Sequence, residues 1–389
     1  MAESLMAKNE QLSGLNSSYG TLSFSEFIVQ YKVQYESCLP KARLFELTLP
    51  WLAATEEFML PKNSHVIVHC LYHTNTGQEP VLSIAWPLVH SLSGESKSSS
   101  KTITSLTSFY SSVTEPIFFV SPSKTAMLQL FVNIDKQYQW HSMQLGDFND
   151  GIVEQALLDY FPYQRLFSKT DNVYQTDIID YSSYYQQRPS QLRNTIKRRE
   201  KKLIKAHQYR TEIITNVEAF DLAFSAYKTI YQQSWKGDEY SFDFIEKVCL
   251  AALIENKLRF GLLFVDDEPA AAQLWFLQTA DDDGAEQKNS ELLQTTASIF
   301  KLAYSPKYQQ YSVGSILSLA LSEHVISKDK ATSIEFGMGS ESYKKDWLTD
   351  KRARRSYQVF NPKSIYGKLA IIRYIALPRL INLFTRKNK

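Results

Sequence analysis

Residues 301–317 read KLAYSPKYQQYSVGSIL and join a strand-like apolar segment to a helical one across a turn that contains Gly314. We expect a strand over 292–304 and a helix from Ser315 to about Ile326. Glycine has no Cβ, so a ligand can approach its backbone closely. The first amides of a helix lack partners within it and, with the helix dipole, favour an anion such as a pyrophosphate. The turn is therefore a candidate phosphate site, although glycine there could also serve chain geometry alone.

The elements around this turn follow a specific order. Ser190 is the expected N-cap of a basic helix, and Asn216 and Ser241 are expected to begin two further helices. The turn at 266–269 separates two of the strands and predicts a hairpin. The expected strands cover 210–215, 258–265, 270–278, 292–304, 333–336 and 357–361, with a short helix at 341–347. From residue 210 onward the order is β-α-α-β-β-β-α-β-α-β.

Several segments within 189–361 resemble the Fem-type and cellulose-biosynthesis (CelD-like) branch of the GNAT acetyltransferase superfamily. They are RNTIKRREKKL (193–203), SWK (234–236), GLLFVDDEPAAAQLWF (261–276), KLAYSPKYQQYSVGSIL (301–317) and EFGMGSESYKKDW (335–347). LTSFYSSVTEPIF (106–118) resembles part of the family's N-terminal half, so the resemblance covers most of the chain. It implies an α/β (α+β) fold of two GNAT-like domains, each a mixed, mostly antiparallel sheet flanked by helices.

The expected division of the chain follows from this resemblance. We expect an N-terminal GNAT-like domain on the acceptor side at 1–185, a C-terminal acyltransferase domain at 186–362 and a basic amphipathic tail at 363–389. The sequence departs from the family pattern at Val313, where proline is usual, and at Ser305, where aspartate is frequent. The general Arg/Gln-x-x-Gly-x-Gly/Ala signature is also not met, because Tyr311 and Ile316 occupy its ends.

The resemblance also implies an activity: transfer of an acyl group, such as acetyl, from acyl-CoA to an amine or hydroxyl. It suggests a small-molecule or glycan-precursor acceptor, such as an amino sugar in envelope or exopolysaccharide synthesis. Amides between Phe300 and Tyr304 would stabilise the oxyanion. The expected residues around acetyl-CoA are Phe300, Leu302, Tyr311, Ser312, Val313, Gly314, Ser315 and Ile316.

Three residues near the end of this region are catalytic candidates. Tyr343 lies where the family places its general acid, with Lys344 beside it, and its plain alternative is a packing tyrosine. Glu335 is a candidate base that could instead pair with Lys344 or Lys345. The candidate acceptor contacts are Trp235, Lys236, Gln273, Trp275 and Tyr304. For Trp235 and Lys236, the alternative is the end of a helix, where a cation interacts favourably with the helix dipole. For Trp275, the alternative is a position in the hydrophobic core.

Two other functions remain open at this stage. A Fem-type transferase would use aminoacyl-tRNA, and the basic helix at 193–205 could then bind RNA. The same helix could bind CoA phosphates or a polyanionic glycan, or be a solvated face. A non-catalytic GNAT-like scaffold in a glycan-synthesis complex is the other alternative. The net charge of +2 gives no general attraction to nucleic acid, so we expect RNA binding only for the Fem-type function.

The remaining patterns concern location and metals. The 389 residues suggest two domains. The polar start argues against a secretory signal, and no apolar run is long enough for a membrane span. The three scattered cysteines, Cys38, Cys70 and Cys249, favour a reducing cytoplasm. The tail at 365–389 could be a membrane-surface helix or a docking helix, which Pro378 would kink or end. His65, His69 and His73 lie four apart on an expected strand, too far apart to share one ion, so we expect no metal.

The first half suggests strands at 64–72 and 80–88, joined by a turn around Asn75 and Gly77. A serine-rich loop is expected at 91–105 and a short helix at 150–161. Another apolar stretch covers 125–133.

Overall fold

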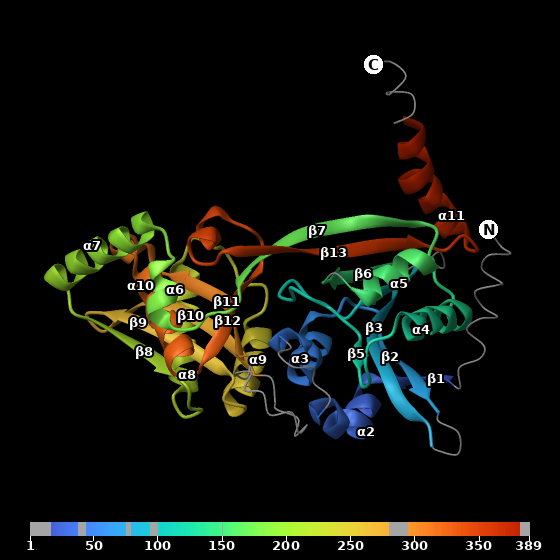
Figure 1. The fold of residues 1–389 in the computed structure, drawn as a ribbon, viewed down its shortest axis with the longest axis horizontal. Coiled ribbons are helices and arrows are strands. Elements are labelled where there is room, and N and C mark those ends of the chain that lie inside the picture. The colour runs from blue at the N-terminus through green and yellow to red at the C-terminus, as the bar shows by residue number, and fades with distance from the viewer. Residues whose placement is uncertain are drawn as a thin grey trace. The chain divides into compact units, whose positions relative to one another are not determined.

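A computed structural model describes residues 17–37, 44–74, 79–93, 100–149, 151–279 and 295–381 (Figure 1). The chain forms two compact units, and each is described by itself. Unit 1 comprises 1–39, 59–170 and 353–389, and unit 2 comprises 40–58 and 171–352. Strands β7 (Gln164–Gln175) and β13 (Asp350–Phe360) each contribute residues to both units. The division into 1–185, 186–362 and 363–389 stays a prediction.

Unit 1 is a mixed sheet with helices packed against it. Its strands follow the order β1-β2-β3-β4-β6-β13, and β5 pairs with β3 off this path. The strands are β1 (Ser17–Ser23), β2 (Ser64–His73), β3 (Val81–Ser93), β4 (Ser100–Ser105), β5 (Ile117–Phe118) and β6 (Ser142–Phe148). The helices are α2 (Phe24–Ser37), α4 (Lys124–Gln137), α5 (Ile152–Tyr160) and α11 (Ile365–Ile371), followed by a π turn, η4 (Ile372–Ala376). Trp86, Phe131 and Phe148 are central to its core.

The structure refines several expectations for unit 1. The strands at 64–72 and 80–88 and the helix at 150–161 are confirmed, while 125–133 forms most of helix α4. The expected loop at 91–105 is wrong at both ends, because these residues complete β3 and form β4. The middle of that loop and the turn at Asn75 and Gly77 lie outside the described residues. The tail helix continues past Pro378. Proline cannot donate a backbone hydrogen bond, and the π turn at Ile372–Ala376, just before Pro378, accommodates this missing bond.

Unit 2 has the sheet order β7-β12-β11-β10-β9-β8. The pairing of β11 with β12 is parallel, and the other pairings from β7 to β8 are antiparallel. The strands are β8 (Tyr209–Ile214), β9 (Leu258–Val265), β10 (Glu268–Thr279), β11 (Thr295–Tyr304) and β12 (Ala331–Met338). The helices and 3-10 turns are η1 (Phe45–Leu47), α3 (Leu49–Met59), α6 (Tyr181–Gln186), α7 (Ser190–Ala206), α8 (Phe220–Gln233), α9 (Phe242–Ile254), η2 (Pro306–Tyr311), α10 (Val313–Ser327) and η3 (Ser342–Asp346).

Local sequence signals explain most of these elements. The β9–β10 hairpin turns at Asp266 and Asp267, which both have positive φ, as the favoured two-residue hairpin turn requires. Ser241 caps α9 by accepting a hydrogen bond from the Phe244 amide, as expected. Two expected caps are shifted: Pro189 precedes α7, and Asn216 accepts from the Ala219 amide one turn before α8 begins. The element order expected from residue 210 onward is confirmed, with the last short helix as the 3-10 turn η3.

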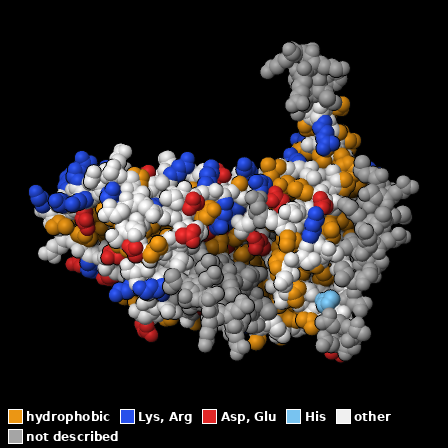
Figure 2. Space-filling view, in the orientation of Figure 1, with side chains coloured by type: hydrophobic (Ala, Val, Ile, Leu, Met, Phe, Trp, Pro, Cys, Tyr) orange, Lys and Arg blue, Asp and Glu red, His pale blue; other side chains and the backbone are white. Residues whose placement is uncertain are grey.

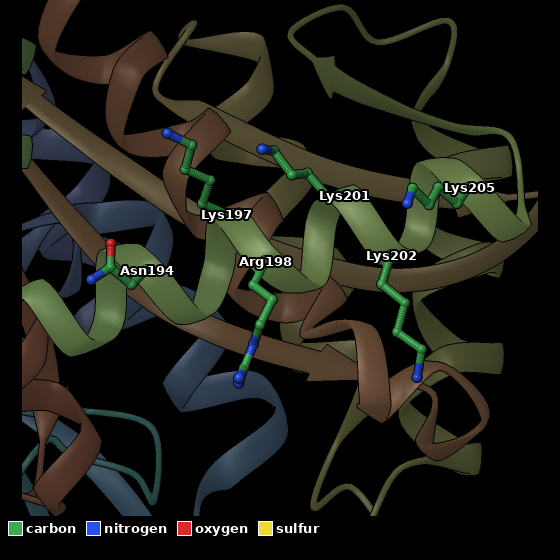
Figure 3. A pocket seen from close by; sticks show the side chains of 6 residues that line it. All are labelled: Asn194, Lys197, Arg198, Lys201, Lys202 and Lys205. Atoms are coloured by element: carbon green, nitrogen blue, oxygen red, sulfur yellow. The ribbon is translucent and has the colours of Figure 1, made fainter.

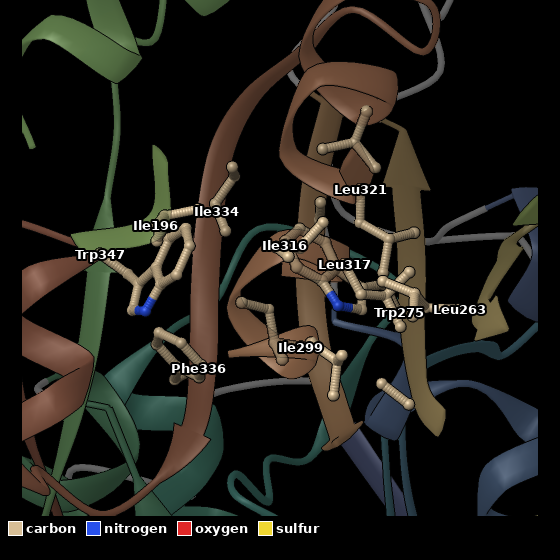
Figure 4. Close-up of a cluster of buried hydrophobic side chains, with 14 of the residues drawn as sticks. Ile196, Leu263, Trp275, Ile299, Ile316, Leu317, Leu321, Ile334, Phe336 and Trp347 are labelled. Carbon is tan, nitrogen blue, oxygen red and sulfur yellow. The ribbon is translucent and has the colours of Figure 1, made fainter. Parts of the chain in front are cut away.

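The core of unit 2 lies between α10 and the sheet (Figure 4). Ile316, Leu317 and Leu321 of α10 pack over Leu263 and Trp275 of the β9–β10 hairpin. A Cβ on Gly261 would lie 2.7 Å from Leu321 Cδ1, so glycine allows the helix to approach this strand closely. This packing fixes the position of the first turn of α10.

A segment far upstream in the sequence also belongs to unit 2. Trp51 of α3 packs edge-on against Phe244 of α9, with 5.0 Å between the ring centroids. Its ring also lies 5.3 Å from that of Phe300 on β11. Among the described residues, none of the helices is both long and apolar enough to span a bilayer.

Candidate active site

The first turn of α10 is the centre of the candidate site. Helix α10 begins at Val313, two residues earlier than expected, because Ser312 adopts a left-handed conformation (φ 56°, ψ 42°) that turns the chain into the helix. The amide of Ile316 donates the first intrahelical bond, to the Ser312 carbonyl at 3.0 Å. The amides of Val313, Gly314 and Ser315 precede it, so they have no acceptor within the helix. The turn therefore leads into a helix start, as expected, and the binding of a phosphate there stays a prediction.

The left-handed Ser312 gives a reason for the departure at Val313. A residue that precedes proline is disfavoured in helical backbone conformations, because the proline ring crowds it. Valine imposes no such restriction on Ser312, and its side chain is fully buried in the core. This turn therefore reaches the helix by a conformation that the proline of the usual family pattern would oppose.

Gly314 is the second residue of the helix, and the ring of Tyr304 is its close neighbour. A Cβ at 314 would lie 3.2 Å from Tyr304 Cδ1, tighter than most contacts of real Cβ atoms. The Tyr304 ring in turn lies 4.3 Å from that of Trp235, between centroids. Glycine thus lets the last residue of β11 lie against the first turn of α10, beside an exposed indole.

Gln273 and Trp275 hold the first turn of α10 from inside the unit. The Gln273 amide nitrogen donates to the Gly314 carbonyl and to Ser318 Oγ, both at 2.8 Å. The Trp275 indole N–H donates to Gln273 Oε1 at 2.9 Å, and both side chains are buried. Their role as acceptor contacts stays a prediction, whereas their hydrogen bonds show that they position α10.

Helix α7 places positive charge beside the same turn. Arg199 Nη1 donates to Ser312 Oγ at 2.6 Å, and Lys202 Nζ lies 5.5 Å from the centre of the Tyr311 ring. Tyr311 itself is buried, with its hydroxyl 3.3 Å from His207 Nε2. Arg199 is a site residue that sequence analysis did not single out, because the basic run gave no sign of which cation faces the turn.

The outer faces of α7 form a basic pocket of about 500 Å³ (Figure 3). Figure 3 shows Lys197 and Lys201 directed to one side of the helix and Arg198 and Lys202 to the other. The lining residues are Asn194, Lys197, Arg198, Lys201, Lys202 and Lys205. A surface of this kind suits a phosphate-rich ligand.

Strand β11 separates from β12 next to this turn. Their parallel pairing ends at Ile299 and Phe336, although β11 continues to Tyr304 and β12 to Met338. Phe300 is the extra residue of a bulge against β10, and Leu302 packs on the core. One edge of Phe300–Tyr304 is therefore released from β12, which is the splayed segment expected to supply an oxyanion donor. The proposed contacts of Phe300 and Leu302 with the cofactor stay predictions.

A buried ion pair lies near Lys236, one of the expected acceptor contacts. Lys301 Nζ contacts both carboxylate oxygens of Glu239 at 2.9 Å, and both side chains are almost inaccessible to solvent. Tyr227 also donates a hydrogen bond to this carboxylate, at 3.3 Å. Sequence analysis missed Glu239 and Lys301, because nothing in their spacing indicates that they meet.

Lys236 is next to this pair. Its ammonium nitrogen lies 5.8 Å from the centre of the Trp235 ring and 5.9 Å from that of Tyr231. Lys236 is exposed as a residue, but desolvation of its ammonium group and then the positive charge of Lys301 lower the pKa of the amine to about 8, while Glu239 opposes the shift. At neutral pH a useful fraction of this amine is therefore neutral and able to accept a proton.

The η3 turn contributes Tyr343 and Lys344. The Tyr343 ring packs edge-on against Phe336, where the pairing of β11 with β12 ends. Burial, with a contribution from the charge of Glu341, raises the pKa of Tyr343 to about 12, so its hydroxyl stays protonated at neutral pH. Lys344 Nζ donates to the Met338 carbonyl at 2.6 Å and pairs with Glu341 at 2.8 Å, and it is buried. Their catalytic roles stay predictions.

Glu335 is held in an ion pair with Arg352, rather than with Lys344 or Lys345. Arg352 Nε also donates to Asn172 Oδ1 at 2.7 Å. A carboxylate fixed by a guanidinium is a weak proton acceptor, because the positive charge favours its ionised form. The ion pair with Arg352 gives Glu335 a structural role. Its assignment as the catalytic base stays a prediction.

The histidines of β2 have partners within unit 1. His69 Nε2 lies 2.9 Å from His90 Nε2, and His69 Nδ1 lies 2.6 Å from the Tyr19 hydroxyl. Burial lowers the pKa of both His69 and His90, with a further contribution from His90 to the first and from His65 to the second. Within the described ranges, no three His, Cys, Asp or Glu side chains are grouped so that they could hold a metal ion.

Comparisons with known proteins concern the family and the fold. Residues 190–280 and 292–345 match the family model described as an acetyltransferase (GNAT) domain. None of the curated proteins matches the sequence significantly. The crystal structure of FemX shares the fold, with a TM-score of 0.58, 10% identity, and coverage of 91% of this chain and 100% of that chain.

Two more distant structures are a conserved protein of unknown function from Bacteroides thetaiotaomicron and a tandem GNAT protein from the clavulanic acid biosynthesis pathway. The first has a TM-score of 0.49 at 10% identity and covers 88% of this chain and 99% of that one. The second has a TM-score of 0.45 at 9% identity and covers 90% of this chain and 100% of that one.

The FemX match extends over both units, so the expected α/β fold with mixed, mostly antiparallel sheets flanked by helices is confirmed. Residues 190–280 and 292–345 are similar to a GNAT acetyltransferase domain.

Proposed function

We propose that the protein is an acyltransferase that moves an acyl group, such as acetyl, from acyl-CoA to an amine or hydroxyl acceptor. The observation that carries this proposal is the placement of Tyr304 in unit 2. Its ring lies against the first turn of α10 and also against Trp235, which precedes Lys236 in the chain. An anion-binding helix start and an amine with a lowered pKa are thus brought to one site.

The cofactor side would hold the phosphates of acyl-CoA. The amides at the start of α10 point toward the ligand, and the helix dipole favours its negative charge. Arg199 adds a guanidinium beside Ser312. The basic pocket on α7 lies on the helix that carries Arg199, so its lysines can extend the contact to further phosphate groups.

On the acceptor side, neutral Lys236 is the proposed proton acceptor. The acceptor nitrogen or oxygen attacks the thioester carbonyl carbon, the carbon–sulfur bond breaks, and the acceptor's proton passes to Lys236. Amides on the released edge of Phe300–Tyr304 stabilise the negative charge on the carbonyl oxygen. Tyr343, which remains protonated at neutral pH, donates its proton to the leaving sulfur.

The acceptor class rests on the family resemblance and on one structural feature. The Trp235 indole is 54% exposed and lies beside Tyr304, and such a flat aromatic surface suits the apolar face of a sugar ring. An amino sugar for envelope or exopolysaccharide synthesis would fit this surface. Acyl-CoA is an intracellular metabolite, so the proposed activity places the protein in the cytoplasm.

A second candidate function is Fem-type transfer from aminoacyl-tRNA. The basic pocket on α7 favours it, because a row of five cations suits an RNA backbone as well as CoA phosphates. In that case the acyl donor would be an aminoacyl ester, and binding would depend strongly on salt.

Calorimetry with acetyl-CoA and with tRNA separates the candidates. We expect heat with acetyl-CoA, and we expect Gly314→Trp to abolish it, because the indole would cover the first amides of α10. Asp243→Trp is a matched control: it is also the second residue of a helix in unit 2, it is exposed, and it should leave binding unchanged.

Each outcome decides between functions. An acetyl-CoA signal lost in Gly314→Trp and kept in Asp243→Trp supports the acyltransferase. A signal with tRNA alone would replace it with the Fem-type function. Heat with neither ligand would favour the non-catalytic scaffold.

A further inference from the structure

The C-terminal helical segment of unit 1 has one face fixed to the unit. The segment comprises α11, the π turn η4 and the helical residues 377–381. Tyr374 stacks on Phe360, with 5.7 Å between centroids, and the guanidinium of Arg165 lies 4.1 Å from the centre of the Tyr374 ring. Ile375 is buried, and a Cβ on Gly367 would lie 2.0 Å from the Asn361 carbonyl oxygen, so the helix is held close to the end of β13.

A second face of the same helix is apolar and exposed. Ile365 is 74% exposed, Leu369 59% and Ile372 53%. These residues and Leu380 follow helical spacing, so they lie in one row along the segment. The exposed large apolar side chains of the segment are Ile365, Tyr366, Leu369, Ile372, Leu377, Leu380 and Ile381. The row lies on a different side from the packed residues, so packing on the unit does not explain it.

Positive charges flank this row. By helical periodicity Lys368 and Arg379 fall on one side of it and Arg373 on the other. Figure 2 shows hydrophobic and cationic side chains together on the segment that Figure 1 labels α11. The sequence has no Asp or Glu after Asp350, and the chain ends with Arg386, Lys387 and Lys389.

We propose that this face binds the surface of an anionic lipid bilayer. Apolar side chains enter the boundary between headgroups and acyl chains, and the flanking cations reach the lipid phosphates. The charges argue against a second copy, because two such faces would bring like charges together in a segment that has no acidic residue. The segment lies on the membrane rather than crossing it, since it is short and charged. This inference is independent of the proposed acyl transfer.

Sedimentation of the full chain with lipid vesicles tests the proposal. One set of vesicles contains phosphatidylcholine alone, and the other also contains phosphatidylglycerol. We expect binding to the anionic set that weakens as salt is raised. Each cation near an anionic surface contributes about a fivefold increase in partitioning, so changing Lys368, Arg373 and Arg379 to glutamine should lower partitioning by roughly 100-fold.

A second variant, Leu369→Glu/Ile372→Glu, tests the apolar row and should reduce binding by at least roughly tenfold. The matched control is Leu222→Glu, which changes an exposed leucine on α8 of unit 2 and should bind like the wild type. Circular dichroism checks that each variant is folded.

Three outcomes would overturn the proposal. The first is that the wild type does not bind the anionic vesicles. The second is that Leu369→Glu/Ile372→Glu binds as strongly as the wild type. The third is that the wild type binds neutral and anionic vesicles equally. Light scattering that shows a dimer lost in Leu369→Glu/Ile372→Glu, without vesicle binding, would assign the face to a second copy instead.

Discussion

The two sides of the proposed site in unit 2, a cofactor side and an acceptor side, are built from different parts of the chain. The cofactor side consists of backbone amides at the start of α10, supported by one guanidinium, Arg199. The acceptor side consists of side chains: the aromatic pair of Trp235 and Tyr304, the Lys236 amine and the buried pair of Lys301 and Glu239.

The two sides should therefore differ in their tolerance to substitution and in their contribution to the pH dependence of the reaction. Backbone donors do not titrate, and they persist through any substitution that preserves the turn and leaves the space above the amides open. Side-chain donors titrate and depend on each neighbour. We therefore expect the pH dependence of the reaction to come from the acceptor side, and we expect the cofactor side to tolerate small substitutions. The following changes test that separation, from the largest expected effect to the smallest.

Lys236→Met should have the largest effect on catalysis. Removing a general base typically lowers kcat by about 10²–10⁴-fold. The Michaelis constant for acyl-CoA should stay the same, because the cofactor side is untouched. In the wild type, the neutral amine is the active form, so kcat/KM should rise as pH increases through about 8, the pKa of Lys236. Steady-state kinetics across pH would show whether this rise of kcat/KM with pH disappears in the variant.

Lys236→Arg is the informative companion to this variant. It keeps the positive charge but remains protonated throughout the accessible pH range. If the arginine variant retains the wild-type rate, Lys236 binds the acceptor by its charge and does not accept a proton.

Lys301→Met should cause the largest loss of stability. Breaking a buried ion pair leaves the Glu239 carboxylate buried without its cation, which costs about 3–5 kcal/mol of unfolding free energy. Removing the positive charge should also raise the pKa of Lys236, which moves the pH limb to more alkaline values. Thermal melts and pH–rate profiles measure the two effects.

The double variant Lys301→Met/Glu239→Leu should recover much of the lost stability, because no buried charge remains. A double variant as unstable as Lys301→Met would mean that packing around these side chains, and not their charge, is responsible.

Arg199→Ala should have a smaller effect, confined to the cofactor side. Loss of one charge-assisted contact should weaken acyl-CoA binding about tenfold, close to 1.4 kcal/mol, with kcat unchanged at saturation. The matched control is Lys228→Ala, which removes a half-buried cation on α8, and calorimetry compares the two variants. A fall in kcat without a change in acyl-CoA affinity would mean that Arg199 acts in the reaction itself and not in cofactor binding.

The same contrast explains what the sequence could predict. The cofactor side follows from local patterns, because the strand, the turn and the helix each have their own periodicity and are adjacent in the chain. Only the helix start was misplaced: the left-handed conformation of Ser312, which no propensity favours for serine, begins α10 two residues before Ser315.

The acceptor side could not be predicted in the same way. Lys301 and Glu239 are 62 residues apart, and Glu239 lies between α8 and α9, so their contact arises only when this segment packs beside β11. Trp51 comes from still farther away and joins Phe300 through tertiary packing alone. Resemblance to a family pointed to Trp235 and Lys236, but the pKa shift of Lys236 depends on neighbours that only the folded chain brings together.

Gly314→Ala gives the smallest expected effect and the strictest test of the cofactor side. The added Cβ would lie 3.2 Å from Tyr304 Cδ1, so the ring must move by a few tenths of an ångström. Alanine favours the helix by about 1 kcal/mol over glycine, which offsets this crowding. Because the amides stay in place, acyl-CoA affinity should change by less than about threefold. If alanine weakens binding as severely as Gly314→Trp, the ligand must contact the glycine Cα directly, and the cofactor side then depends on this residue as strictly as the acceptor side depends on Lys236.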